Sequence, residues 1–138
     1  MGRDGAPNER GTAAVEMALL LPVLVLVLLS ILELGRVLDA WVVATNAARE
    51  GARYAAYGES AQTVRDKVGV YLTKGLGGRT DVNPPASGEI TVTNAQGTPG
   101  SAVQVAVPLK VRVFSPWAKG LGLPDPVVVV GAVTMRLQ

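Results

Sequence analysis

Hydrophobic and polar residues follow distinct patterns in successive parts of this chain. Residues 1–10 mix glycine, proline and both charges without any period, which predicts a disordered leader. An apolar run follows at Met17–Leu32, interrupted only by Pro22 and Ser30. Extended back to Thr12, the apolar segment is roughly 31 Å of helix, which matches a bilayer core of about 30 Å. We therefore expect a transmembrane helix over residues 12–32.

Helical periodicity continues beyond the apolar run. Alanine recurs every fourth residue, so the helix carries a slowly winding stripe of small side chains. The stripe consists of Ala40, Ala44, Ala48, Ala52 and Ala56. Small side chains let another element approach the helix backbone closely. We expect one helix from about Thr12 to Tyr57, with bends at Pro22 and Gly35 and with residues 33–57 outside the membrane.

The remaining residues predict a short helix and a small sheet. Ser60 is a suitable N-cap for a helix over residues 60–74. After a predicted loop at Arg79–Gly88, strands are expected at about 89–93, 102–114 and 127–137, in each of which apolar residues recur at alternate positions. Within the second strand, Pro108 indicates a bulge or an edge position. The predicted fold class is α+β, in which a long N-terminal helix continues into a domain with one short helix and a three-stranded antiparallel sheet.

Composition excludes several functions. The 13 Lys and Arg residues nearly balance 11 Asp and Glu residues, and without a basic patch we expect no nucleic-acid partner. The chain has neither cysteine nor histidine, which removes thiol chemistry and the commonest general base and metal ligand. The carboxylates are scattered, and no phosphate-binding motif is complete. We expect no enzymatic activity, no cofactor, no metal and no small-molecule substrate.

Glu16 is the one charge within residues 12–32. A carboxylate at the bilayer centre costs about 2.5–3.5 kcal/mol and much less near the edge, so membrane insertion tolerates this residue at the interface. One interpretation is that Glu16 only marks the N-terminal end of the helix, where the dipole favours a negative charge. A cleavable secretory signal is a second alternative, but the small-x-small cleavage site is missing.

The spacing of Gly11 and Glu16 resembles the processing site of type IV pilin-like proteins, with a charged leader before Gly11 and an apolar helix after Glu16. Together with RGTAAVEMALLLP, ELGR and AAREGARYAA, it resembles the TadE-like pseudopilins of tight-adherence (Flp/Tad) pilus systems. Met17 departs from the pattern, since many relatives have an aromatic residue there. The resemblance implies that residues 1–11 are a leader peptide, which a prepilin peptidase removes by cutting between Gly11 and Thr12.

The resemblance also implies a structural role in pilus assembly or secretion, and thereby in cell adhesion. After cleavage, Glu16 of one subunit would pair with the Thr12 amine of its neighbour and so set the register of the assembly, because an unpaired charge is costly in a low-dielectric setting. The partners would be membrane lipid and other pilin or pseudopilin subunits. Arg49, Glu50 and Arg53 are candidate subunit contacts, although a solvated helix face is the favoured interpretation of these three residues taken alone.

The larger C-terminal portion indicates the topology. We expect a single-pass protein of the cytoplasmic (inner) membrane that associates with a pilus, with its N-terminus cytoplasmic and residues 33–138 extracytoplasmic. An alternative function is an uncleaved single-pass scaffold that binds other envelope components through its extracellular domain.

Overall fold

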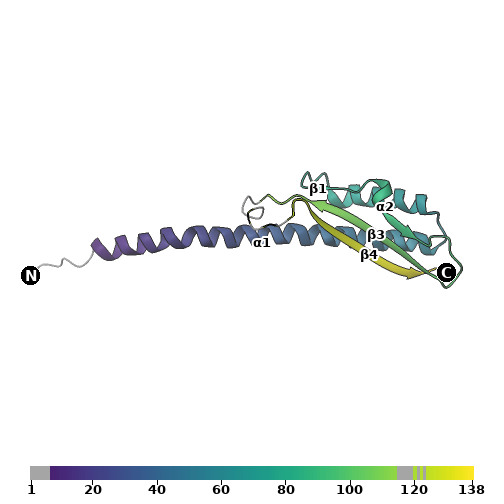
Figure 1. Ribbon diagram of the computed structural model, residues 1–138, viewed down its shortest axis with the longest axis horizontal. Coiled ribbons are helices and arrows are strands. Elements are labelled where there is room, and N and C mark those ends of the chain that lie inside the picture. The colour runs from purple at the N-terminus through teal and green to yellow at the C-terminus, as the bar shows by residue number, and fades with distance from the viewer. Residues whose placement is uncertain (1–6, 115–119, 121, 123) are drawn as a thin grey trace, which may run out of the picture. The chain divides into compact units, whose positions relative to one another are not determined.

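A computed structural model describes residues 7–114, 120, 122 and 124–138, and it confirms the α+β class. The helices are α1 (Pro7–Ala56), α2 (Ala61–Leu76) and the short 3-10 helix η1 (Ser87–Glu89). The strands are β1 (Val82–Asn83), β2 (Thr91–Thr93), β3 (Ala102–Val111) and β4 (Val127–Arg136), as Figure 1 shows. The chain divides into two compact units, Met1–Leu34 and Gly35–Gln138, and α1 contributes to both.

Helix α1 begins earlier than the sequence predicts. We expected a disordered leader over residues 1–10 and a helix start near Thr12, whereas the helix starts at Pro7, so the prediction of disorder is wrong for residues 7–10. Proline is favoured in the first turn of a helix, where its fixed φ is suitable and its missing N–H leaves no donor unpaired. The helix runs through Pro22 and Gly35, and it ends at Ala56, close to the predicted end.

Helix α2 confirms its predicted cap. The side chain of Ser60 accepts a hydrogen bond from the backbone N–H of Thr63 at 3.2 Å. Gly77 ends the helix in the left-handed conformation, with φ 56°, which glycine adopts without strain. One face of α2 is buried, namely Val64, Val68, Leu72 and Leu76.

The sheet has four strands, not the three that we expected. The additional strand is β1, which lies within the segment that we predicted to be a loop. β3 is the central strand: β4 pairs antiparallel with its whole length along one edge, and β1 and β2 share the other edge. The loop prediction was wrong at β1, because a strand of two residues is too short to show an alternation of apolar and polar residues.

Pro108 lies in the central strand without a bulge, so the predicted bulge is wrong, whereas the predicted edge position holds locally, because neither β1 nor β2 pairs with this residue. The pairing of β3 with β4 is regular through Pro108, which lies opposite Val130. Neighbouring residues of a strand direct their backbone groups to opposite edges, and the N–H of Arg112 points towards β1, where it binds Asp81 O at 2.8 Å. Pro108 therefore faces the same edge, at a gap in register between β1 and β2. No ladder hydrogen bond is lost at this position.

The core of the C-terminal unit lies between the inner face of the sheet and the two helices. Val103, Val105, Val107, Leu109 and Val111 of β3 are completely buried. The alanine stripe of α1 is buried as well, as expected from its small side chains. Figure 1 shows α2 and the C-terminal part of α1 beside the strands.

Two glycines set how closely the elements of this core approach one another. A Cβ at Gly131 of β4 would lie 2.3 Å from the backbone carbonyl carbon of Ala44 in α1. A Cβ at Gly51 of α1 would lie 2.6 Å from a methyl group of Val68 in α2. The backbones of α1 and β4 are thus nearly in contact, because the facing positions carry alanine and glycine.

Candidate membrane and assembly site

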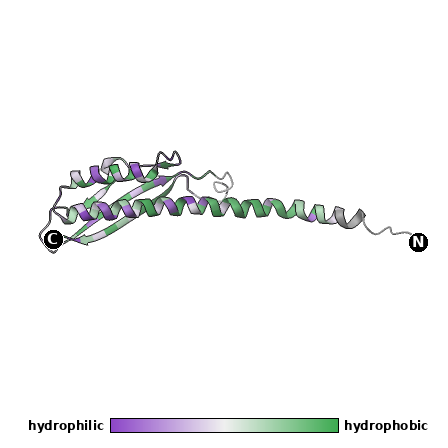
Figure 2. Ribbon diagram, turned by 180° about the vertical axis from the view of Figure 1, so that it is seen from behind, coloured by the Kyte–Doolittle hydropathy of each residue, from purple (hydrophilic) through white to green (hydrophobic). Residues whose placement is uncertain are grey.

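The N-terminal part of α1 exposes nearly all of its apolar side chains. The large apolar residues of Met17–Leu32 have exposed fractions between 42% and 71%. One helix of the described chain, Gly11–Ala56, is long and apolar enough to cross a membrane by length and composition. Figure 2 colours most of the N-terminal part of α1 as hydrophobic, whereas the part beside the strands is mixed. Two residues interrupt the apolar run without disturbing the helix. The hydroxyl of Ser30 donates to Leu26 O at 2.7 Å, and Pro22 lies inside an unbroken helix.

Burial of this apolar surface in a membrane contributes far more free energy than the single charge of Glu16 opposes. Each large apolar side chain removed from water contributes about 1.5–3 kcal/mol, so the segment as a whole contributes on the order of 20 kcal/mol. Glu16 near the membrane edge subtracts at most about 3 kcal/mol. In the described part of the chain no other element covers this surface, so lipid or another apolar helix is its natural environment.

The predicted processing residues share the first turns of α1. Gly11, Thr12 and Glu16 are all helical and exposed. Thr12 and Glu16 are four residues apart, so their side chains lie on one face, one turn from each other. The described residues provide Glu16 with no hydrogen-bond or ion-pair partner. A peptide bond at Gly11 can leave the helix at low cost, because helix ends fray and glycine lowers helix stability by about 1 kcal/mol.

Charged residues form a cluster at the start of the C-terminal unit. Arg36 of α1 binds Asp81 at 2.8 Å, and Arg79 binds the same carboxylate at 2.6 and 3.1 Å. Arg79 also pairs with Asp39 of α1. The guanidinium of Arg36 lies 4.3 Å from the centre of the Phe114 ring, within the range of a cation–π contact.

This cluster clamps α1 to the residue before β1. Asp81 is only 9% exposed and is the one buried charged residue of the described chain. The hydrogen bond from Arg79 holds the pKa of Asp81 well below its ordinary value, against the opposing effect of burial, and Arg36 lowers this pKa further. The clamp was missed because its members are about 40 residues apart.

The three candidate contact residues divide into a pair and a single cation. Arg53 binds Glu50 through two hydrogen bonds of 2.6 and 3.1 Å, and this pairing lowers the pKa of Glu50. Arg49 is exposed on the same helix, and the described residues give it no polar partner. The arrangement fits both interpretations, a solvated helix face and a subunit contact.

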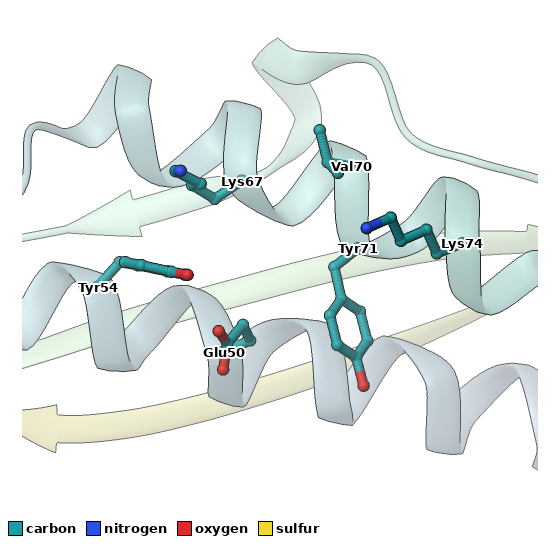
Figure 3. Close-up of a pocket in the computed structure, with 6 residues that line it drawn as sticks. All are labelled: Glu50, Tyr54, Lys67, Val70, Tyr71 and Lys74. Atoms are coloured by element: carbon teal, nitrogen blue, oxygen red, sulfur yellow. The ribbon is translucent and has the colours of Figure 1, made fainter.

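A hollow lies beside this pair, between α1 and α2, with a volume of about 280 Å³. Figure 3 shows its lining residues, which are Glu50 and Tyr54 of α1 and Lys67, Val70, Tyr71 and Lys74 of α2. The ammonium group of Lys67 lies 5.6 Å from the centre of the Tyr54 ring. The described residues hold no group of three or more carboxylates that would bind a metal.

The comparisons with known proteins agree with the N-terminal resemblance. A family model described as TadE-like protein matches residues 11–53, which comprise most of α1 and begin at the predicted cleavage residue. This match confirms the predicted resemblance to the TadE-like family. No curated protein and no solved structure matches the chain.

The family match indicates a class of protein but no mechanism. TadE-like proteins are structural and pilus-associated, and the match connects this chain to the assembly of tight-adherence pili. With its one N-terminal apolar helix, the chain has the features of a single-pass membrane protein. The match ends at Arg53, so α2 and the sheet lie outside it.

Proposed function

We propose that this protein is a pseudopilin or minor pilin of a tight-adherence (Flp/Tad) pilus or secretion apparatus. The observation that carries the proposal is an exposed apolar stretch, residues 12–32, whose one charge, Glu16, stands five residues after Gly11 in the segment that matches the TadE-like family. The protein is structural, without catalytic activity. Its partners are membrane lipid, a prepilin peptidase and other pilin or pseudopilin subunits.

Processing and anchoring use the same segment. The peptidase cuts between Gly11 and Thr12 and removes the leader, residues 1–11. Residues 12–32 then span the inner membrane, with the N-terminal side cytoplasmic and residues 33–138 outside the cytoplasm. This topology accounts for a small folded unit joined to an apolar helix that the unit itself leaves uncovered.

Glu16 sets the register between subunits. Cleavage creates a cationic amine on Thr12, one helical turn from Glu16 of the same chain and accessible to Glu16 of a neighbour. In a dry environment an unpaired carboxylate is costly, so subunits assemble in the register that pairs the two charges. Arg49, Glu50 and Arg53 provide further subunit contacts outside the membrane.

The experiment replaces Glu16 with Ala and, as a matched control, with Asp in the native host. Both chains should reach the membrane in normal amounts, because removal or shortening of a carboxylate does not impair insertion. Glu16→Ala should abolish piliation, whereas Glu16→Asp should retain it in part. Normal piliation by Glu16→Ala would contradict the register role and favour the uncleaved scaffold, for which Glu16 has no function.

A further inference from the structure

The outer edge of β4 is a long row of backbone groups that lack partners within the described chain. Leu137 N donates to Ser101 O, so the odd-numbered residues of β4 direct their backbone groups to β3. The even-numbered residues direct theirs to the opposite edge. These residues are Val128, Val130, Ala132, Thr134 and Arg136, all of them exposed, and the described residues form no hydrogen bond with their backbone groups.

This edge has none of the usual protection. Proteins guard edge strands by shortness, bulges, prolines or inward-pointing charges. The opposite edge of the sheet follows this rule, since β1 has two residues and β2 has three. β4 has ten residues in regular register, and Arg136 is its only charge. A valine-rich edge of this length, with a single charge at its end, can serve as a template for a further strand.

We propose that β4 accepts an added β-strand from a different protein of the envelope. The strand would be rich in β-branched residues and would carry one charge, a carboxylate near the end that lies beside Arg136. Its alternate side chains would pack beside Val128 and Val130, which are 54% and 49% exposed on the outer face of the sheet. Main-chain hydrogen bonds would give affinity, and the side chains would give specificity.

A second copy of this chain fits the edge poorly when both copies are anchored in one membrane, and this step depends on the proposed function. Gly131 packs on Ala44, and Gln138 N donates to Ala56 O, so β4 runs parallel to α1. Antiparallel pairing of two β4 strands would therefore place the Gly35 ends of the two copies at opposite ends of the joined sheet. Parallel pairing about a twofold axis would set equivalent outward-bonding residues opposite each other, whereas a parallel ladder bonds each residue to the two neighbours of the residue opposite it. A heterologous strand has neither problem.

The test uses the full chain in its native host. A photo-crosslinking amino acid, benzoylphenylalanine, replaces Val130 at the free edge and, as a control, the exposed residue Gln62 on α2. We expect an adduct with another protein from position 130 only. Mass spectrometry of the crosslinked peptide should show a segment rich in β-branched residues, whose one charge is an acidic residue near its end.

A proline substitution then tests the pairing itself. Ala132→Pro removes an N–H that points to the free edge, whereas Ala132→Ser retains it. The adduct should fall at least tenfold with proline and stay within twofold with serine. Trypsin resistance of the membrane-extracted chain shows that the variant is folded; if Ala132→Pro does not accumulate, Thr134→Pro, which is also directed outward, takes its place.

Four results would overturn the proposal: an adduct of two copies of this chain, no adduct, an adduct that survives the proline substitution, or a partner segment that is helical or carries charges besides the one carboxylate. Retention of the chain in carbonate-washed membranes and the mass of its N-terminus, measured in the same cells, report separately on anchoring and processing. Failure of the strand proposal is therefore distinguishable from failure of the proposed function.

Discussion

The two halves of α1 are both apolar, yet they differ in the size of their side chains and in their burial. In Met17–Leu32 the leucines and valines are exposed, with fractions between 42% and 71%. In Ala40–Ala56 the alanines are buried, most of them completely. Large side chains around the whole helix suit a lipid environment, whereas a stripe of small ones allows the helix backbone to contact a sheet. Side-chain size along one helix thus distinguishes a membrane anchor from a packing surface.

The largest expected effect concerns the packing half. Gly131→Val would place a branched side chain where even a Cβ collides with the backbone of Ala44. We expect the C-terminal unit to lose about 4 kcal/mol of unfolding free energy or more, because backbone cannot move aside as a flexible side chain does. Urea denaturation of the full chain in detergent, followed by near-UV circular dichroism, measures the loss. The outward-facing control Ala132→Val should change stability by less than about 0.5 kcal/mol, and equal effects of the two substitutions would refute the close approach.

The second prediction concerns the membrane half. Leu24→Arg should raise the free energy of insertion by about 3–4 kcal/mol, because an apolar residue is replaced by a cation near the middle of the span. Carbonate extraction of membranes should then release much of the protein. Val42→Arg, a similar change at an exposed position in the other half of α1, should leave extraction unchanged. Release of both variants, or of neither, would remove the distinction between the two halves.

The clamp that attaches α1 to β1 gives the third prediction. Asp81→Asn should lower stability by about 2–3 kcal/mol, since it weakens charge-assisted hydrogen bonds in a buried site. The exposed Asp66→Asn is the control and should have little effect, because the amide oxygen of asparagine can still accept the hydrogen bond from Gln62 Nε2. Urea midpoints at pH 7 measure both changes.

The same site predicts a pH dependence. The pKa of Asp81 in the folded state lies below its ordinary value of 3.8. Its contribution to stability is therefore complete above pH 3.8 and is lost as the pH falls through the folded-state pKa. The loss of stability below that pH should be smaller for Asp81→Asn than for the natural chain, and parallel curves for the two chains would contradict the assignment.

The smallest effects compare two helical glycines. Gly51→Ala should destabilise by about 1–3 kcal/mol, because its Cβ would crowd Val68. Gly69→Ala in α2 meets no atom within 4 Å and should stabilise by about 0.5–1 kcal/mol through helix propensity. Thermal unfolding of both variants measures the sign, and a stabilising Gly51→Ala would show that α1 and α2 are packed less closely.

Local sequence patterns correctly predicted the structural features that depend on neighbouring residues. The alternation in β3, the Ser60 cap of α2 and the alanine stripe each involve residues within a few positions of one another, and the structure confirms all three. The resemblance of the N-terminal segment was also readable, because Gly11 and Glu16 stand at a fixed spacing. Gly11, Thr12 and Glu16 keep their roles as predictions until processing is measured.

Features that depend on contacts between distant residues could not be predicted from the sequence. The clamp joins Arg36 to Asp81 across the chain, and neither residue has a local signal for the contact. Strand β1 is two residues long, and only Val82 in a polar segment hinted at it. Pro108 indicated an edge position, but nothing in the sequence shows that this position is a gap between two short strands beside a central strand.

The mature N-terminus tests the proposed function most directly. Intact-mass analysis of the protein from native membranes should show a chain that begins at Thr12, lacking residues 1–11. Gly11→Val, which places a branched residue before the predicted scissile bond, should retain the leader and so provide the matched control. A natural chain that begins at Met1 or Gly2 in cells with an active prepilin peptidase would contradict the account and favour the uncleaved scaffold.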